Sequence, residues 1–217
     1  MGSGFEPEVD YSIARKRMVR DQLSARGIEN DRLLQAFMEV PRHLFLDPAT
    51  GARAYDDCSF PIGYSQTISQ PYTQAMMMQY LQISSSDRIL EVGTGSGYQT
   101  AILSLLGREV FSVERIAPLS RNAGEVLSRI RTGRIRLKIT DGSDGWEFYA
   151  PYDKIIVSAA MREKPVSLID QLGVEGMLIA PVAKEHEHLV LYSWVEGKIK
   201  EQVLSRCAFV PLLKGTE

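Results

Sequence analysis

A short apolar run that breaks into a glycine-rich loop constrains the fold of this chain more than any other feature. Residues 89–92 read Ile-Leu-Glu-Val, and glycines follow at every second position, at Gly93, Gly95 and Gly97. An apolar stretch that can form a helix, residues 101–106, comes directly afterwards. This order predicts a buried strand, a tight loop and a helix, the unit with which a doubly wound α/β sheet opens its ligand crevice. Glycine lets the backbone turn sharply and approach a ligand closely, and the helix start offers free N–H groups to a carboxylate or phosphate.

The spacing of the glycines indicates which ligand the loop binds. A dinucleotide fingerprint places its third glycine three residues after the second, and that position is Tyr98 here. The acidic residue Glu91 also precedes Gly93 by two positions. The pattern E-x-G-x-G-x-G is similar to motif I of the S-adenosylmethionine-dependent methyltransferases. Taken alone, an ordinary strand-to-helix turn explains the loop equally well.

The rest of the chain alternates between strand and helix patterns from residue 88 onwards. Strands are predicted at residues 89–92, 109–113, 135–139, 154–157, 177–181, 189–195 and 199–210, and helices at 98–106, 118–130 and 165–172. Such alternation predicts a mainly parallel sheet covered by helices on both faces. Glu196-Gly197 is a hairpin signal between the last two strands. We therefore expect an α/β fold, a doubly wound, mainly parallel seven-stranded sheet with an antiparallel C-terminal hairpin edge.

The N-terminal part of the chain has a different pattern. One helix is expected from Asp10 to Gly27 and a second from Asn30 or Asp31 to Pro41. Residues 41–71 have little regular pattern, and residues 74–81 look helical again. Long segments without regular structure in compact domains are usually functional. We expect residues 1–82 to supply N-terminal helices and a substrate loop, and residues 83–217 to form the core of the same compact unit.

Composition excludes several classes of function. The net charge of -2 lacks the basic excess of a nucleic-acid binder. No apolar run approaches the ~20 residues needed to span a bilayer, and the acidic start of the chain lacks a signal-peptide pattern. The two cysteines, Cys58 and Cys207, and the pair His186-x-His188 lack metal-ligand spacing. We expect a cytoplasmic protein with no metal, membrane or nucleic-acid partner.

Acidic residues follow two further predicted strands. Glu114 ends the second strand, 21 positions after Gly93, where doubly wound folds place an acceptor for ribose hydroxyls. Asp141-Gly142 follows the third strand, where the carboxylate is available to an adenine amino group. An ion pair with Arg115 and a plain Asp-Gly turn are the competing explanations. Because the carboxyl ends of parallel strands meet at one edge, three such sites in a row favour a nucleoside ligand.

Motifs along nearly the whole chain, from about Met18 to Leu212, closely resemble those of protein-L-isoaspartate O-methyltransferases. They are Met18-Val19-x-x-Gln22-Leu23, Arg26-Gly27-Ile28, Val40-Pro41-Arg42-His43-x-Phe45, Ala54-Tyr55-x-Asp57, Pro61-Ile62-Gly63, Gln66-Thr67-Ile68-Ser69-Gln70-Pro71, Glu91-x-Gly93-Thr94-Gly95-Ser96-Gly97-Tyr98-Gln99, Val113-Glu114-Arg115-Ile116 and Phe209-Val210-Pro211-Leu212.

The resemblance implies a repair enzyme. Such an enzyme transfers the methyl group of S-adenosyl-L-methionine to the α-carboxylate of an L-isoaspartyl residue in a damaged peptide or protein, and leaves S-adenosyl-L-homocysteine. The ester then closes to a succinimide, whose hydrolysis restores some aspartate. The resemblance places catalytic roles on Ser69 and Thr67. Cofactor contacts are expected at Gln66, Ile68, Gln74, Glu91, Gly93, Thr94, Gly95, Gly97, Glu114, Arg115, Asp141 and Gly142. The sequence does not reveal the oligomeric state, and we expect a monomer.

This chemistry needs few polar groups. A carboxylate with an α-carboxyl pKa of ~3.5 is ionised at neutral pH, so no general base is required. Methyl transfer from a sulfonium is an in-line displacement, and the protein mainly holds oxygen, carbon and sulfur in register. The hydroxyls of Thr67 and Ser69 are expected to orient the carboxylate in a desolvated loop. His43 is therefore interpreted as structural.

The chain departs from the family pattern at four places. Ser65, Thr140 and Ala183 stand where relatives have glycine, and Ala208 stands where an arginine is common. Ser65 stiffens its loop if the backbone there needs a positive φ. These departures leave open a methyltransferase for another acceptor and a silent module that binds the cofactor. An amino-methyltransferase of nucleic acid is disfavoured because residues 157–160, Val-Ser-Ala-Ala, lack an Asn-Pro-Pro-Tyr-like run.

Overall fold

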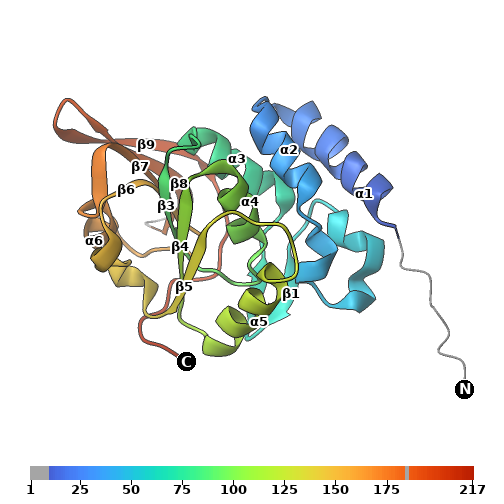
Figure 1. Cartoon of the computed structure of the whole chain (residues 1–217). Helices are drawn as coiled ribbons and strands as arrows, with labels where there is room; N and C mark the ends of the chain where they lie inside the picture. The colour runs from blue at the N-terminus through green and yellow to red at the C-terminus, as the bar shows by residue number, and fades with distance from the viewer. Residues whose placement is uncertain (1–9, 184–185) are drawn as a thin grey trace, which may run out of the picture.

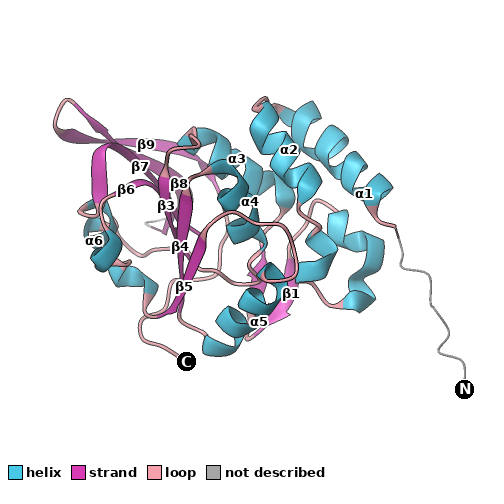
Figure 2. Cartoon of the chain, viewed as in Figure 1, coloured by secondary structure: helices cyan, strands magenta, loops and turns pink. Residues whose placement is uncertain are grey.

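A seven-stranded sheet forms the centre of the computed structural model, which describes residues 10–183 and 186–217 (Figures 1 and 2). The strand order is β5-β4-β3-β6-β7-β8-β9. Strands β3 to β7 pair in parallel, and β8 and β9 add antiparallel pairs at one edge. The strands are β3 Arg88–Val92, β4 Glu109–Glu114, β5 Ile135–Ile139, β6 Tyr152–Val157, β7 Leu172–Ala183, β8 Glu187–Val195 and β9 Lys198–Arg206. The predicted fold class, with its antiparallel hairpin edge, is confirmed.

Helices cover both faces of this sheet because its central strands are apolar on both sides. Strand β3 is buried along Ile89, Leu90, Glu91 and Val92, as expected for a strand inside a parallel sheet. Within the alternating part of the chain the helices are α4 Tyr98–Leu106, α5 Ala117–Leu127 and α6 Val166–Ile169. The prediction of a longer third helix was wrong, because β7 begins at Leu172 and takes up the end of that segment. Strand β9 likewise ends at Arg206, four residues before its expected end at Val210.

Two helical segments precede the sheet, as predicted, but the first is not uniform. Helix α1, Ser12–Arg17, continues as a π-helix, Met18–Leu23, and a 3-10 turn, Ser24–Arg26. Gly27 then ends it with a φ of 91°, the left-handed conformation that glycine adopts freely. Helix α2, Asp31–Glu39, is capped by Asn30, whose side chain accepts from the Leu33 N–H.

The segment with little sequence pattern is more ordered than expected. It contains 3-10 helices at Arg42–Phe45 and Pro48–Tyr55, and a hairpin of β1, Phe60–Gly63, with β2, Gln66–Ile68. The two residues of its turn, Tyr64 and Ser65, have φ values of 53° and 56°. Positive φ at both positions is the geometry of a type I′ turn, which matches the twist of a hairpin. Ser65 therefore occupies a backbone position that glycine would adopt at lower cost.

Helix α3, Pro71–Leu81, joins this hairpin to the sheet and begins three residues before the predicted start at Gln74. Proline is favoured in a first helical turn because its missing N–H has no partner there anyway. Buried residues of α2 and α3, such as Phe37 and Met77, share one core with Ile89 of β3 and Ile102 of α4. The other face of the sheet packs a second core that includes Phe111 and Leu178. No helix among the described residues is long and apolar enough to cross a membrane.

Candidate active site

A cavity lies at the carboxyl ends of β3, β4 and β6, where a doubly wound sheet binds ligands. Its lining comes from the glycine loop, from the residues after β4 and from the β1–β2 hairpin. Most of the predicted site residues line this cavity. They are Gln66, Thr67, Ile68, Ser69, Gln74, Gly93, Thr94, Gly95, Glu114, Arg115 and Gly142. Residues far apart in the sequence are therefore brought together at the predicted edge.

The three glycines of the loop serve different contacts. All have positive φ, 96° at Gly93, 53° at Gly95 and 88° at Gly97, a region that residues with a Cβ rarely adopt. A Cβ on Gly97 would lie 3.0 Å from the Cβ of Ala123, so this glycine allows the loop to pack against α5. A Cβ on Gly95 would lie 3.3 Å from Ile62 Cδ1. Gly97 thus supports the loop from behind, while Gly93 and Gly95 form the cavity wall.

Glu114 is fixed by the backbone around it. Its Oε2 accepts from the Gly95 N–H and its Oε1 from the Ile116 N–H, both at 2.9 Å. The residue is 6% exposed and lines the cavity. Each carboxylate oxygen can accept a second hydrogen bond, so the free lone pairs are available to vicinal hydroxyls of a ribose.

Glu91 lies behind the cavity wall and is completely buried. Its carboxyl group accepts from Thr100 Oγ1, from Ser112 Oγ at 2.6 Å and from Gln99 Nε2 at 3.1 Å. Burial raises the pKa of Glu91 to about 7, although the three hydrogen bonds oppose this rise. Ser112 in turn lies 2.6 Å from Thr94 Oγ1. Glu91 is therefore placed to support the glycine loop from within the protein.

Asp141 and Arg115 contact the segment formed by residues 213–217. Asp141 Oδ1 accepts from the N–H and the hydroxyl of Ser143, and its Oδ2 accepts from the Gly215 N–H at 2.6 Å. Although burial opposes ionisation, the hydrogen bonds from Gly215 and Ser143 lower the pKa of Asp141. Arg115 donates to the Gly215 carbonyl and to the Glu217 carboxylate, each at 3.1 Å. The segment thus crosses the adenine end of the predicted site, and Gly142 rather than Asp141 lines the cavity.

A second cavity of about 440 Å³ lies on the other side of the Ser69 loop. Both cavities are lined by Thr67, Ser69, Ser158, Val210 and Pro211. Ala208, one of the departures from the family pattern, lines the second cavity only. Thr67 and Ser69, the two residues expected to be catalytic, therefore lie between the two cavities.

Arg42 holds the Ser69 loop, a function that the sequence did not indicate although the residue belongs to a quoted motif. The side chain is fully buried. Its guanidinium donates to the carbonyls of Ala54 and Ser69 at 2.8 Å and to Gln74 Oε1 at 3.2 Å, and lies 4.8 Å from the centre of the Tyr98 ring. No carboxylate among the described residues pairs with it, and burial lowers its pKa.

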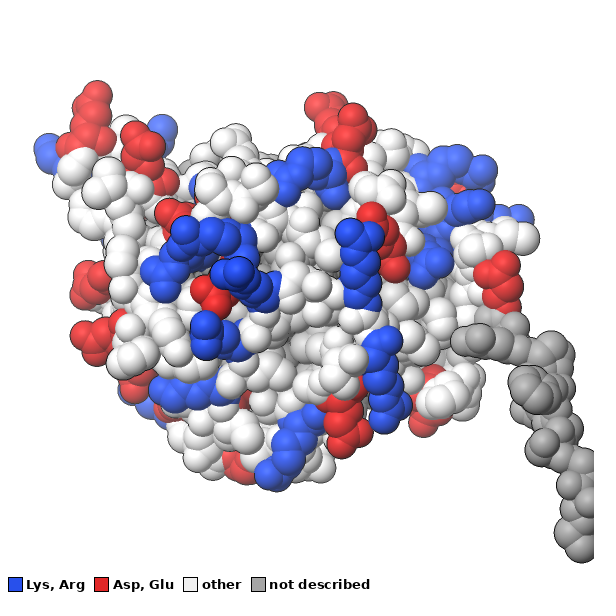
Figure 3. All heavy atoms as spheres, viewed as in Figure 1, with Lys and Arg blue, Asp and Glu red and all other residues white. Residues whose placement is uncertain are grey.

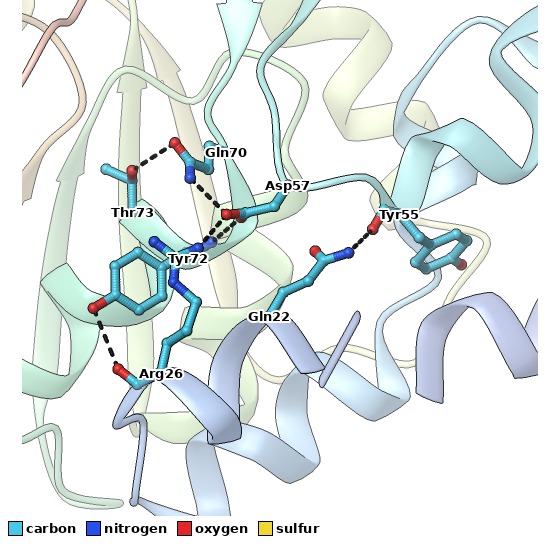
Figure 4. A network of polar contacts seen from close by, with 7 residues as sticks. All are labelled: Gln22, Arg26, Tyr55, Asp57, Gln70, Tyr72 and Thr73. Carbon is cyan, nitrogen blue, oxygen red and sulfur yellow. Dashed lines mark hydrogen bonds and ion pairs between the residues drawn. The ribbon is translucent and has the colours of Figure 1, made fainter. Parts of the chain in front are cut away.

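A polar network on Asp57 anchors the start of α3 to the N-terminal helices (Figure 4). The Asp57 carboxylate accepts from Gln70 Nε2 at 2.7 Å, from the Tyr72 N–H at 3.1 Å and from the Arg26 guanidinium. Arg26 also stacks 3.6 Å from the centre of the Tyr72 ring. Asp57 therefore connects three segments that are distant in sequence.

The donors and acceptors of the first cavity suit S-adenosyl-L-methionine. Gly93 and Gly95 present bare backbone, Glu114 offers carboxylate lone pairs, and Ile62 and Ile116 supply apolar surface.

Comparisons with known proteins show the family of the chain. Residues 14–217 match the family described as protein-L-isoaspartate(D-aspartate) O-methyltransferase. The protein-L-isoaspartate O-methyltransferase of Geobacter metallireducens is 42% identical over 207 residues, covering 94% of this chain and 96% of the relative. A relative of the same name from Marinobacter nauticus, numbered 1, is 47% identical over 201 residues, covering 93% and 92%.

Solved structures show the same fold. A Plasmodium falciparum protein, assigned as a protein-L-isoaspartate O-methyltransferase and bound to S-adenosyl-L-homocysteine, superposes with a TM-score of 0.82 at 23% identity, covering 96% of this chain and all of that one. The family match along nearly the whole chain and the sequence identity to these relatives show that the chain belongs to the protein-L-isoaspartate(D-aspartate) O-methyltransferase family.

Proposed function

We propose that this protein transfers a methyl group from S-adenosyl-L-methionine to the α-carboxylate of L-isoaspartyl residues in damaged peptides and proteins. The family supports this activity, and one structural observation carries it. The hydroxyl-bearing residues Thr67 and Ser69 line both the cavity at the glycine loop and the second cavity behind it. A methyl donor in the first cavity and a carboxylate in the second would meet at these residues.

The chain's own groups supply binding and orientation. When bound, the cofactor supplies a methyl group on a positively charged sulfur, and its transfer to a carboxylate oxygen leaves a neutral thioether. Glu114 would hold the ribose hydroxyls of the bound cofactor, and the backbone of Gly93 and Gly95 would allow its nucleoside to approach closely. Thr67 and Ser69 donate hydrogen bonds to the acceptor carboxylate, which is ionised already and needs no base. Arg42 fixes the carbonyl of Ser69 and so keeps this loop in register.

The acceptor is a peptide or a protein chain and not a nucleic acid. Acidic and basic side chains are interspersed over the face shown in Figure 3, whereas a nucleic-acid binder concentrates basic residues in one patch. We further propose that the protein acts as a monomer. Light scattering during turnover tests this part.

The deciding experiment compares two peptides that differ only in one linkage. Methyl-labelled S-adenosyl-L-methionine is incubated with matched isoaspartyl and aspartyl peptides. We expect base-labile label on the isoaspartyl peptide and none on its aspartyl counterpart. Equal labelling of both would indicate another carboxylate acceptor. Label on neither, with tight binding of S-adenosyl-L-homocysteine by calorimetry, would indicate a silent cofactor-binding relative.

A further inference from the structure

Ser158 is the one residue at the boundary of the two cavities whose hydroxyl the methyl-transfer scheme above does not use. It follows β6 directly, and its N–H donates to the Val92 carbonyl at 2.9 Å. Two residues further on, Ala160 exchanges hydrogen bonds with residues 210 and 212, at 2.7 and 2.8 Å. A Cβ built on Gly93 would lie 3.5 Å from the Cβ of Ser158. The Ser158 side chain is thus held beside the glycine loop, facing the space where the two cavities meet.

The hydrogen bonds of Gln99 determine the direction of the Ser158 hydroxyl. Gln99 Nε2 lies 3.1 Å from Glu91 Oε1 and 2.8 Å from Ser158 Oγ. The ionised Glu91 carboxylate can only accept, so in that state the atom of Gln99 facing Glu91 is the amide nitrogen with its two hydrogens. One hydrogen goes to Glu91 and the other to Ser158. Ser158 Oγ is therefore an acceptor in this contact, and its own proton is free to point elsewhere.

No hydrogen bond from that proton to an acceptor is formed among the described residues. Within residues 10–183 and 186–217, the only hydrogen bond of Ser158 Oγ is the one from Gln99. Thr67 and Ser69 line both cavities together with Ser158. A carboxylate offers about four lone-pair positions and can accept from several hydroxyls at once. Three hydroxyl donors around one space suit a carboxylate better than any neutral group.

We propose that Ser158 is an acceptor-binding residue that donates a hydrogen bond to the carboxylate to be methylated, and that Gln99, held by Glu91, is the positioning residue that directs it. This inference rests on the proposed function. Thr67 and Ser69 then hold the carboxylate from the hairpin side, and Ser158 holds it from the sheet side. The sheet contributes to acceptor recognition as well as to cofactor binding.

The test compares Ser158→Ala with wild-type protein on an isoaspartyl peptide. Loss of one hydrogen bond to a charged group lowers kcat/KM about 10- to 100-fold. We expect most of the change in KM, because the bond already forms in the ground state. Calorimetric binding of the same peptide, with S-adenosyl-L-homocysteine present, should weaken by a similar factor. The affinity for S-adenosyl-L-homocysteine itself should stay within about twofold.

Three further variants separate this role from a structural one. Ser158→Thr retains the hydroxyl and should restore most of the peptide affinity. Gln99→Met removes the directing amide and should raise KM, and its combination with Ser158→Ala should add little, because both act on one hydrogen bond. Ser128→Ala is the matched control, since that hydroxyl bonds only to the Glu125 carbonyl. Circular dichroism and thermal unfolding confirm that each variant is folded.

The outcomes distinguish the inference from the function on which it rests. Wild-type protein that leaves the isoaspartyl peptide unlabelled overturns both. Wild-type activity together with unchanged KM and peptide affinity in Ser158→Ala overturns only the role of Ser158. Loss of S-adenosyl-L-homocysteine affinity with peptide affinity intact also overturns it, because the hydroxyl would then face the cofactor. Parallel loss of peptide affinity in Ser158→Ala and Gln99→Met supports it.

Discussion

The two sides of this active site are built in different ways. The cofactor side consists of loops that directly follow strands β3, β4 and β5, and its carboxylates at Glu114 and Asp141 accept mainly from backbone N–H groups. Glu114, for example, accepts from the N–H of Ile116 two residues away. The acceptor side consists of residues 60–71 and 207–212, and it is fixed by side chains far away. Arg42 reaches the Ser69 carbonyl across 27 positions.

This difference predicts where each side is vulnerable. Parallel strands place their carboxyl ends at one edge through backbone hydrogen bonds, so the cofactor side tolerates the loss of a single side chain better. The acceptor side depends on a few side chains with distant partners, such as Arg42, which donates to main-chain carbonyls, and Asp57, which accepts from Gln70 and the Tyr72 N–H. Removal of one such side chain should loosen the loop and leave buried acceptors without donors. The following four variants test this contrast, in order of decreasing effect.

Arg42→Met should have the largest effect and act on the acceptor side. It leaves the buried carbonyls of Ala54 and Ser69 without their donor, which costs about 3 kcal/mol of unfolding free energy. The displaced loop should lower kcat about 10²-fold. Urea unfolding and single-turnover kinetics measure both effects. Arg129→Met is the control, since that arginine is exposed and pairs only with Glu125 at 3.9 Å. Full activity and stability in Arg42→Met would contradict the proposal that the acceptor side depends on single side chains.

The pH dependence of the unfolding free energy, through the buried Glu91, tests the cofactor side. The pKa of Glu91 is raised from an ordinary 4.5 to about 7, so the folded state binds this proton more tightly than the unfolded state does. The resulting stabilisation is complete below about pH 4.5 and is lost as pH rises to about 7. Each pKa unit is worth about 1.4 kcal/mol, so about 3 kcal/mol is lost over this window.

The measurement is the difference in unfolding free energy between wild-type protein and Glu91→Gln, which does not titrate at this site. We expect wild-type protein to lose about 3 kcal/mol relative to the variant as pH rises from 4.5 to 8. Glu125→Gln, at an exposed site, should show no such trend. A pH-independent difference for Glu91→Gln would mean that the carboxyl is ionised throughout.

Asp57→Ala should have an intermediate effect on the acceptor side. It removes the acceptor for the Tyr72 N–H in the first turn of α3 and the partner of Gln70. Loss of a comparable helix cap costs about 1 kcal/mol, and we expect KM for the peptide to rise several-fold. Asp56→Ala is the control, since its only ion pair is the exposed one with Arg53 at 3.7 Å. Equal effects of Asp57→Ala and Asp56→Ala would show that Asp57 does not support the Ser69 loop.

Ser65→Gly should have the smallest effect, and it should be favourable. A residue with a Cβ in the left-handed region costs about 1–2 kcal/mol, and glycine costs about 0.5–1 kcal/mol in unfolded-state entropy. The net gain is therefore about 0.5–1 kcal/mol in unfolding free energy. Ser65→Ala keeps the Cβ and should give no gain. A destabilised Ser65→Gly protein would show that the serine side chain itself stabilises the hairpin.

The sequence anticipated most of the sheet and the cofactor side. Strands such as β3 and β5 were predicted at nearly their observed bounds, because a buried strand and a strand-end glycine loop leave local patterns. The hairpin of residues 60–68 was missed because its turn, Tyr64-Ser65, lacks the usual glycine. Arg42 and Asp57 were quoted only as parts of motifs, since no local pattern reveals a partner dozens of residues away.

By itself, the sequence determined the fold class, the edge of the sheet that binds a ligand and the family of the chain. The fold class and the ligand-binding edge follow from periodicity and spacing, which are local in sequence, and the family follows from the resemblance of the motifs. Only the tertiary structure decided that Glu91 supports the loop from behind, that Asp141 bonds to Gly215, and that Ser158 accepts from Gln99 beside the two cavities. These properties depend on hydrogen bonds between residues that are far apart in sequence. Folding brings the two partners together, and no local sequence pattern indicates which donor meets which acceptor.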